Sequence, residues 1–495
     1  YTMGELSEAL QFTFGLINSS NKYLTAETFG FKIAASGASL KKKQTWSLEQ
    51  EPNGGNDVYF KSFLGRYLGA DKNGKVSCDT ETPSEENKFQ VEATTDGRWA
   101  IKSSKYERYF GGSGDNLSCF EQTISNTYLW VIHLAMHPQV NICNIRRKCY
   151  AHLSPNGEEV HMTKRTPWGE DTLITLLFKD KGYALVTSNS KYLGYDGTLH
   201  AEPKGQECLF TIEFYSGKIA FKSKHDGRYL SPVGPKGQLQ GRKDKPGKDE
   251  EFALIDSHPQ ITLFSKTKGK YVSGKQGLQL SANQIDAEES ETFQMEIDPA
   301  TEKVFFRNDK EKYWRLDGQS ILADAADTNN ANTHFVVEWH GRFIRLVASN
   351  GNYVSIKPSG HLFAPSKDAE DFTFRLTNSC LLCNRAIIVF RGEHGFVGCK
   401  GDKLEGNRAT YDIFQMEEND GAYGIKAPNG KYWAVDGDKK VAATGSQAQP
   451  FLIQLTKNSK LALKPENGDG YVTSDHVGIM TASGSGIDKK TLFEY

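Results

Sequence analysis

The chain has 495 residues, which corresponds to three to five domains at the usual size of roughly 100 to 200 residues per domain. Its 60 Lys and Arg residues against 61 Asp and Glu residues give a net charge of −1, which excludes a global basic field for nucleic acid or anionic membrane. The sequence has no run approaching eighteen or so apolar residues and no basic start followed by an apolar core. We therefore expect neither membrane insertion nor secretion.

A short hairpin pattern recurs along the chain, and residues 65–78 show it most clearly. Tyr67, Leu68 and Ala70 form an apolar run, and the next four residues are of types that tolerate positive φ. After this turn, the apolar residues Val76 and Cys78 alternate with polar ones, as in a second strand. This pattern predicts two antiparallel strands joined by a tight turn. In chain order the copies are centred on Tyr23, Tyr67, Tyr109, Tyr150, Tyr192, Tyr229, Tyr271, Tyr313, Tyr353, Phe396, Tyr432 and Tyr471.

The twelve copies follow one another at intervals of about 41 residues, and a fixed period of this size indicates a repeat architecture. Some twenty residues after each hairpin aromatic, another apolar residue opens a short run. These residues are Trp46, Phe89, Trp130, Leu173, Phe210, Phe252, Phe293, Phe335, Phe374, Phe414, Phe451 and Phe493. An alternating strand such as residues 99–102 usually follows, so each repeat is expected to hold about four strands. We interpret Tyr67 and its equivalents as core or barrel-layer residues, because a binding aromatic would not be needed in every repeat.

The repeats group in threes. His137-Pro138-Gln139-Val140 recurs as His258-Pro259-Gln260-Ile261 three repeats later, and proline at matching points marks connectors between domains. The resulting domains, each of about 120 residues, are 1–138, 139–259, 260–380 and 381–495. A propeller is less consistent with the chain, which lacks a Trp-Asp signature. Three repeats that close around one axis form a β-trefoil, so the predicted fold is all-β with four tandem β-trefoils.

No enzyme motif is found in the sequence. It has no Gly-x-Ser-x-Gly, no His-Glu-x-x-His and no Walker loop. Arg391-Gly392-Glu393-His394-Gly395 places a base beside a cation and an acid, but it lacks a nucleophile, and we interpret it as a contact loop. We therefore expect that the protein is not an enzyme and needs no cofactor.

The eight cysteines lie at irregular positions, several of them strand-like and apolar. In a long chain without a secretory signal, this usage indicates reduced thiols and a cytoplasmic protein. Cys380-Leu381-Leu382-Cys383 has the spacing of half a zinc site or of a redox pair. It stands alone and has apolar neighbours, so packing is favoured over a metal site.

Basic clusters are the strongest binding signal. They lie at residues 41–43, at 146–148 and within 236–248. Each one alone is more often a solvated face than a site, but several on a neutral chain predict an acidic partner contacted at more than one surface. A phosphate on Ser39, directly before Leu40 and three lysines, would add about −1.5 to −2 charges and neutralise the first cluster.

Several long strings resemble the fascin family of actin-bundling proteins. They include Phe14-Gly15-Leu16-Ile17-Asn18, residues 21–27, 39–44, 135–140 and 388–396, and the closing Glu494-Tyr495, so the resemblance runs essentially end to end. It implies four β-trefoils in a two-lobed monomer that crosslinks filamentous actin into parallel bundles. It also implies a place in the actin cytoskeleton, in filopodia and similar protrusions. The net charge of −1 gives no reason to expect nucleic acid as a partner.

The resemblance also implies site residues. One actin-binding surface of the family lies in the cleft between the first and fourth domains, and the matching positions are Lys22, Lys41, Lys43, Arg391, Glu393 and His394. Ser39 matches the family's inhibitory phosphorylation site. A second surface, on the opposite lobe, would include Arg147 and Lys148, and Cys149 stands there in place of an expected basic residue.

A multivalent β-trefoil lectin is the alternative function. Such a protein would repeat a Gln-x-Trp sugar signature in its domains. Only Gln44-Thr45-Trp46 shows this signature. A sugar-binding array is therefore less consistent with the sequence than an actin crosslinker.

Overall fold

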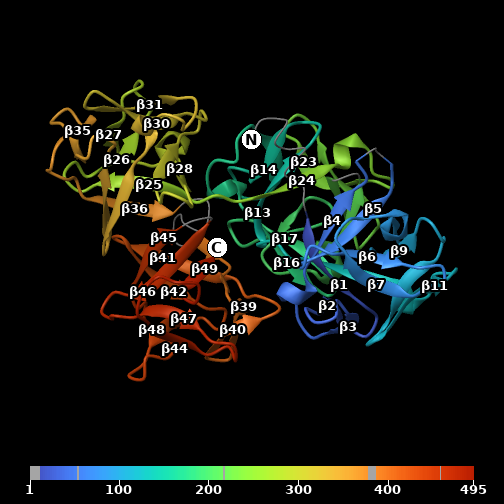
Figure 1. Ribbon diagram of the computed structural model, residues 1–495. Helices are drawn as coiled ribbons and strands as arrows, with labels where there is room; N and C mark the ends of the chain where they lie inside the picture. The colour runs from blue at the N-terminus through green and yellow to red at the C-terminus, as the bar shows by residue number, and fades with distance from the viewer. Residues whose placement is uncertain (1–11, 53–54, 216–217, 377–385, 457–458) are drawn as a thin grey trace. The chain divides into compact units, whose positions relative to one another are not determined.

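The computed structural model describes residues 12–52, 55–215, 218–376, 386–456 and 459–495 (Figure 1). Strands dominate these ranges, and the helices found in them are short 3-10 turns. They are η1 Lys42–Gln44, η2 Glu85–Asn87, η3 Asn126–Tyr128, η4 Glu170–Thr172, η5 Gly205–Cys208, η6 Lys248–Glu250, η7 Glu289–Glu291 and η8 Ala331–Thr333. Over the same ranges, none of these helices has the length and apolar character needed to cross a membrane. Cys380, Cys383 and the predicted boundary at residue 380 lie outside the described residues.

The first twelve strands form one sheet. They are β1 Thr13–Ile17, β2 Tyr23–Ala26, β3 Ile33–Gly37, β4 Trp46–Gln50, β5 Val58–Ser62, β6 Tyr67–Ala70, β7 Val76–Thr80, β8 Phe89–Ala93, β9 Trp99–Ser103, β10 Tyr109–Ser113, β11 Asn116–Glu121 and β12 Leu129–Leu134. Strands β1, β4, β5, β8, β9 and β12 pair in that order, and β12 returns to β1, which closes a barrel. The other six strands form the hairpins β2–β3, β6–β7 and β10–β11. Two barrel strands and one hairpin from each of three repeats make a β-trefoil.

The second sheet closes in the same way. Its strands are β13 Gln139–Asn144, β14 Cys149–Leu153, β15 Val160–Lys164, β16 Ile174–Lys179, β17 Gly182–Val186, β18 Tyr192–Leu193, β19 Leu199–His200, β20 Phe210–Tyr215, β21 Lys218–Ser223, β22 Tyr229–Val233, β23 Gln238–Lys243 and β24 Phe252–Asp256. The barrel runs β13, β16, β17, β20, β21 and β24, and β24 pairs with β13.

The third sheet repeats this order. Its strands are β25 Gln260–Ser265, β26 Lys270–Ser273, β27 Ser281–Gln284, β28 Thr292–Ile297, β29 Val304–Arg307, β30 Tyr313–Asp317, β31 Ser320–Ala325, β32 Val336–His340, β33 Phe343–Val347, β34 Tyr353–Ile356, β35 Leu362–Ser366 and β36 Phe372–Leu376. Strand β25 pairs with β28 and β36, and a bridge between Val304 and Phe335 completes the barrel.

The fourth trefoil has a split first strand. Its strands are β37 Ala386–Ile388, β38 Arg391–Gly392, β39 Gly395–Lys400, β40 Lys403–Arg408, β41 Phe414–Asn419, β42 Ala422–Lys426, β43 Tyr432–Val435, β44 Val441–Gly445, β45 Phe451–Thr456, β46 Lys460–Pro465, β47 Tyr471–Ser474, β48 Met480–Gly484 and β49 Leu492–Glu494. Strand β37 pairs with β41 whereas β38 pairs with β49, so the two short strands together act as one barrel strand. The all-β, four-trefoil prediction is confirmed.

The deepest core position of each hairpin is the residue after the predicted aromatic. These residues are Leu24, Leu68, Phe110, Ala151, Leu193, Leu230, Val272, Trp314, Val354, Val397, Trp433 and Val472, and all are 0% exposed. The aromatics themselves are buried at Tyr67 and Tyr229 but only partly buried at Tyr313, Tyr353 and Tyr432. Of the predicted core or barrel-layer positions, a core position is therefore wrong for these partly buried members, because successive strand residues face opposite sides.

The chain forms two compact units. Unit 1 comprises Tyr1–Thr163, Ile174–Thr187 and Lys191–Asp256, and unit 2 comprises Lys164–Leu173, Ser188–Ser190 and Ser257–Tyr495. One hydrophobic cluster joins the first two trefoils in unit 1, and another joins the last two in unit 2. Two shared cores, rather than four independent ones, account for the two lobes.

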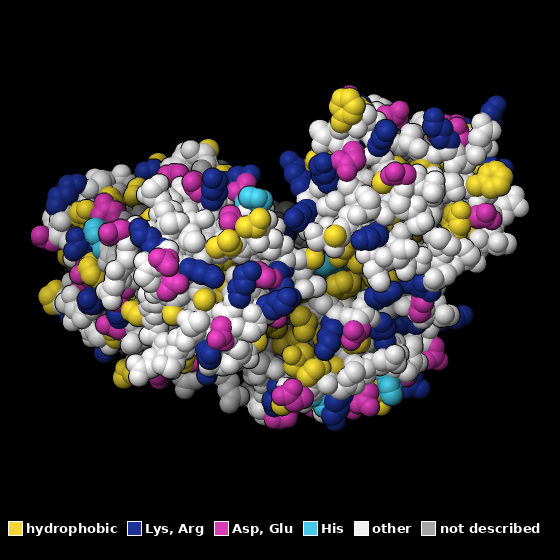
Figure 2. Space-filling model, turned by 90° about the horizontal axis from the view of Figure 1, so that it is seen from below, with side chains coloured by type: hydrophobic (Ala, Val, Ile, Leu, Met, Phe, Trp, Pro, Cys, Tyr) yellow, Lys and Arg dark blue, Asp and Glu magenta, His cyan; other side chains and the backbone are white. Residues whose placement is uncertain are grey.

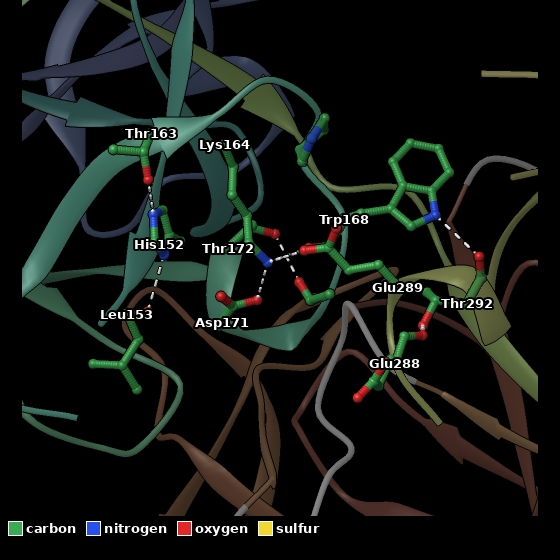
Figure 3. A network of polar contacts seen from close by, with 12 residues as sticks. His152, Leu153, Thr163, Lys164, Trp168, Asp171, Thr172, Glu288, Glu289 and Thr292 are labelled. Atoms are coloured by element: carbon green, nitrogen blue, oxygen red, sulfur yellow. Dashed lines mark hydrogen bonds and ion pairs between the residues drawn. The ribbon is translucent and has the colours of Figure 1, made fainter. Parts of the chain in front are cut away.

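Residues 164–173 belong to unit 2, although the chain on either side of them belongs to unit 1. Figure 3 shows Trp168 pointing toward Thr292, and its Nε1 donates to the Thr292 carbonyl oxygen at 3.0 Å. Trp168 is 2% exposed. The Lys164 ammonium lies 2.8 Å from both Asp171 Oδ1 and Glu289 Oε1. A buried indole and paired charges therefore fix this segment to the third trefoil.

Candidate binding surfaces

The first basic surface consists of Lys22, Lys41, Lys42 and Lys43 on the first trefoil. All four side chains are exposed. Lys22 precedes β2, Lys41 is the N-cap residue of η1, and Lys42 and Lys43 open that helix. Their neighbours Tyr23 and Leu40 belong to one small buried cluster, which places the chain before β2 beside the chain before η1. The structure thus brings three predicted residues together and adds Lys42.

Gln44 anchors the lysine-bearing turn to the trefoil. Its Nε2 donates to Thr25 Oγ1 at 3.0 Å, and its Oε1 accepts from the Lys41 backbone N–H at 3.1 Å. Trp46 Nε1 donates to the Leu24 carbonyl oxygen at 3.0 Å. Both side chains of the lone Gln-x-Trp signature are buried and make internal contacts. This use of Gln44 and Trp46 gives no support to the sugar-binding alternative.

Lys43 pairs with a carboxylate on the neighbouring hairpin. Its Nζ lies 2.7 Å from Glu27 Oε2, and the two side chains are 49% and 42% exposed. An ion pair this exposed contributes only about 0–1 kcal/mol to stability, because water screens both charges. Lys43 can therefore exchange this partner for another carboxylate at little cost.

Ser39 lies in the bend between β3 and η1. Its side chain is partly buried, Leu40 after it is buried, and Lys41 after that is exposed. A phosphate on Ser39 would therefore lie two residues from the first lysine of the first basic surface. Its charge would lower the positive potential there.

Arg391, Glu393 and His394 lie on the tight hairpin formed by β38 and β39 in unit 2. Glu393 pairs with Lys489, and the hydrogen bond from Lys489 holds the pKa of the Glu393 carboxyl below its usual range. His394 Nε2 lies 3.9 Å from Glu393 Oε2. Arg391 Nη1 lies 3.8 Å from Glu494 Oε2, and the guanidinium lies 5.4 Å from the Phe396 ring centroid. The three predicted residues are brought together and held by internal contacts.

Gly395 sets the shape of this hairpin. Its φ is +145°, and a Cβ at this position would lie 2.8 Å from the Arg408 carbonyl oxygen. A residue with a side chain would therefore displace β39 from β40. Lys22, Lys41 and Lys43 lie in unit 1, whereas this hairpin lies in unit 2. A single surface that combines both groups stays a prediction.

The second basic surface consists of Arg146, Arg147 and Lys148 between β13 and β14. Lys148 is exposed and has a φ of 54°. Arg147 Nη1 donates to the Gly234 carbonyl oxygen and Nη2 to the Pro232 carbonyl oxygen, both at 3.0 Å. Arg147 therefore braces the β22–β23 hairpin, and Lys148 presents the exposed charge.

The expectation that the second surface lies on the opposite lobe from the first is wrong with respect to the lysines. Lys148 belongs to unit 1, as do Lys22, Lys41 and Lys43, because the first two trefoils share a core. In Figure 1 the β2–β3 hairpin lies at the lower edge of unit 1, whereas strands β13 and β14 lie toward its upper left. The two surfaces are therefore separate without being on different lobes.

Cys149 does not contribute to the exposed part of the second surface. It is 6% exposed, and its Sγ donates to the Arg147 carbonyl oxygen at 3.3 Å. Arg146, which is not among the predicted site residues, is exposed, and its Nη1 lies 2.8 Å from Asp249 Oδ2. The run of basic residues at 146–148 was the signal that could have included it.

Charges elsewhere are mixed in sign. Figure 2 shows a face on which Lys and Arg side chains lie among Asp and Glu side chains. Lys243 illustrates this mixing, since its Nζ lies 3.4 Å from Glu250 Oε1 and 3.8 Å from Asp249 Oδ2. Within the residues that the structure describes, no group of three or more His, Cys, Asp and Glu side chains is arranged to hold a metal ion.

The fold defines a protein of tandem β-trefoils. The fascin domain model matches residues 20–132, 140–254, 267–374 and 393–495. Fascin-2 of Homo sapiens is 42% identical over 499 residues, and fascin-2 of Bos taurus is 41% identical over 497 residues, with 99% of each chain covered in both cases. Fascin of Strongylocentrotus purpuratus is 36% identical over 505 residues, which cover 98% of this chain and 99% of that one. This chain belongs to the fascin family.

Proposed function

We propose that this chain is a monomeric actin crosslinker that packs filaments into tight parallel bundles through at least two actin-binding surfaces. Membership of the fascin family supports actin as the partner. The observation that carries the two-surface mechanism is that the first basic surface lies on the first trefoil and the second on the second trefoil, which are separate sheets (Figure 1). The protein would act in the cytoplasm, in filopodia and other actin-rich protrusions.

Each surface has a defined part in this mechanism. The exposed lysines of the first basic surface meet acidic side chains of one filament, and Lys148 meets those of another. Opposite charges speed the encounter and fix its orientation. Once one surface is bound, the second filament meets the other surface at high effective concentration, so bridging needs no further contact. Arg391, Glu393 and His394 would add contacts to the first filament, and phosphorylation of Ser39 would weaken that contact.

Co-sedimentation with filamentous actin tests the proposal, because bundles pellet at low speed whereas singly decorated filaments pellet only at high speed. Lys41→Glu with Lys43→Glu is expected to abolish low-speed pelleting while high-speed co-sedimentation remains measurable. Lys148→Glu is expected to give the same result through the other surface. Combining the three substitutions is expected to remove both signals.

A matched control reverses two exposed lysines elsewhere, Lys439→Glu with Lys440→Glu on the β43–β44 turn. This variant is expected to bundle like the wild type. Light scattering must show that each variant is a monomer, since a dimer bridges filaments with one surface per chain. A folded monomeric single-surface variant with normal bundling contradicts the role of that surface.

A further inference from the structure

Phe29 lies at the tip of the β2–β3 hairpin and is 93% exposed. It is the most exposed large apolar residue in the part of the chain that the structure describes, ahead of Ile285 at 77% and Leu278 at 60%. Exposure of nearly the whole Phe29 side chain to water is unfavourable in free energy, and the folded chain does not bury it. Single exposed apolar residues are common on protein surfaces, so the case for a partner rests on the order of this tip and on the charges beside it.

The tip that carries Phe29 is held in place by its neighbours. The Glu27 backbone N–H donates to the Lys32 carbonyl oxygen at 2.8 Å, which closes the turn. Phe31, two residues after Phe29, lies under the Arg66 guanidinium, with 4.4 Å between Arg66 Cζ and the ring centroid. Arg66 is fixed in turn by a 2.7 Å hydrogen bond from its Nη1 to the Asp79 carbonyl oxygen. Since the backbone is already ordered, binding through Phe29 loses little conformational entropy.

Basic side chains lie near this tip, one of them paired with an acidic residue. Lys43 of the first basic surface pairs with Glu27, two residues before Phe29, and the exposed Lys32 follows three residues after it. An apolar centre with a charged rim is the usual anatomy of the strongest contacts at a protein interface. The positive rim selects a partner that presents carboxylates around an apolar pocket.

We propose that Phe29 is the apolar anchor of the first basic surface and enters a pocket on the actin filament while Lys43 and Lys32 pair with carboxylates at its edge. This inference rests on the proposed function and names the residue that supplies its affinity. Charged contacts alone are screened by salt, whereas burial of Phe29 is not. The anchor would therefore maintain the contact at salt concentrations that screen the charged pairs.

Phe120 on the same trefoil provides a matched control. It is 56% exposed, but Arg108 Cζ lies 5.0 Å from its ring centroid. The variants are Phe29→Ala, Phe29→Trp and Phe120→Ala in the full-length chain. Their affinity for filamentous actin is measured by high-speed co-sedimentation at several salt concentrations. Thermal unfolding checks that the fold is intact, and Phe29→Ala is expected to unfold at the wild-type temperature because the side chain is exposed.

Phe29→Ala is expected to weaken filament binding by roughly thirtyfold, as for the loss of a central aromatic anchor, without changing the dependence on salt. Phe29→Trp is expected to bind within about threefold of the wild type, because a large ring still fills the pocket. Phe120→Ala is expected to bind normally. If Phe29→Ala binds filaments within twofold of the wild type, the inference is overturned, whereas the proposed actin-binding function is unaffected.

Two further results separate the possible failures. If the wild-type chain does not co-sediment with filaments, the proposed function itself fails. Vesicles containing anionic phospholipid test a membrane as the occupant, since an exposed aromatic beside lysines also suits a lipid surface. Wild-type vesicle binding that Phe29→Ala abolishes, together with unchanged actin binding, would overturn the proposal in favour of a membrane contact.

Discussion

The Tyr67 hydroxyl donates a 2.7 Å hydrogen bond to Glu49 Oε2, which lies on the barrel strand of the preceding repeat. Lys61 Nζ lies 3.0 Å from Glu49 Oε1 and 5.2 Å from the centroid of the Tyr67 ring. The Tyr–Glu pair recurs in every trefoil, as Tyr109–Glu92, Tyr229–Glu213, Tyr313–Glu296, Tyr353–Glu338 and Tyr432–Glu417. In these six repeats the aromatic therefore joins its own repeat to the preceding one through its hydroxyl, and the residue after it fills the core.

This arrangement predicts different costs for two neighbouring substitutions. Leu68→Ala is expected to destabilise the first trefoil by about 2 to 5 kcal/mol, because it leaves a cavity at a fully buried site. Tyr67→Phe is expected to lower stability by about 1 to 2 kcal/mol, because it removes one hydrogen bond to the Glu49 carboxylate. That carboxylate still has its ion pair with Lys61. Hydrogen exchange of peptides from residues 12–134 in the intact chain measures both. A larger cost for Tyr67→Phe than for Leu68→Ala would contradict this view of the core.

Ser39→Asp tests the predicted regulatory site. It adds a negative charge beside the first basic surface and is expected to weaken actin binding several-fold, most strongly at low salt, where screening is least. Ser39→Ala is expected to bind normally, and so is Ser125→Asp, which adds the same charge at an exposed site of the same trefoil. Co-sedimentation across a salt series is the measurement. Equal weakening by both aspartates would point to net charge rather than to position 39.

Arg147 and Lys148 are expected to differ although they are adjacent. Arg147→Gln removes two hydrogen bonds to the β22–β23 hairpin and is expected to lower stability by about 1 to 3 kcal/mol. Lys148→Gln is expected to leave stability unchanged and to reduce bundling. Thermal unfolding and low-speed pelleting separate the two effects. A stable Arg147→Gln variant that has lost bundling would instead assign a direct contact to Arg147.

The segment 164–173 is expected to respond to pH through Glu170. Burial, aided by Asp171, raises the pKa of the Glu170 carboxyl to about 7. The folded state thus holds a proton that the unfolded chain, with an ordinary carboxyl pKa, releases. The contribution of Glu170 to stability is complete at pH values below the unfolded pKa and is lost as pH rises toward 7.

Glu170→Gln removes this titration. Denaturant unfolding at pH 5 and pH 8 is expected to show a smaller loss of stability in Glu170→Gln than in the wild type. The charges of Asp171 and Lys164, which raise and lower the pKa of Glu170 respectively, are present in both proteins. Identical pH profiles for the two proteins would show that Glu170 is ionised in the folded chain throughout this range.

Most residues of the candidate site could be predicted from the sequence. The triple-lysine run predicted an exposed basic surface, and the resemblance to fascins added Lys22 and the hairpin at 391–394. Neither source distinguished the bracing role of Arg147 from the exposed charge of Lys148. The difference depends on carbonyl oxygens 85 and 87 residues away, which the fold brings to the guanidinium. Phe29 was missed because an aromatic in a turn resembles the many aromatics that are buried.

The repeat period, the hairpins, the strand composition of each repeat and the grouping into trefoils could be predicted from sequence patterns alone, because strand alternation and turn residues act over a few neighbours. The central residue of each hairpin was decided by the packing of the folded chain. Leu68 faces the core while Tyr67 reaches Glu49, since adjacent strand residues point to opposite faces. The packing of the folded chain also decided that two trefoils share each core and that Trp168 packs in unit 2. These outcomes depend on contacts between segments far apart in the chain, on which local patterns place no constraint.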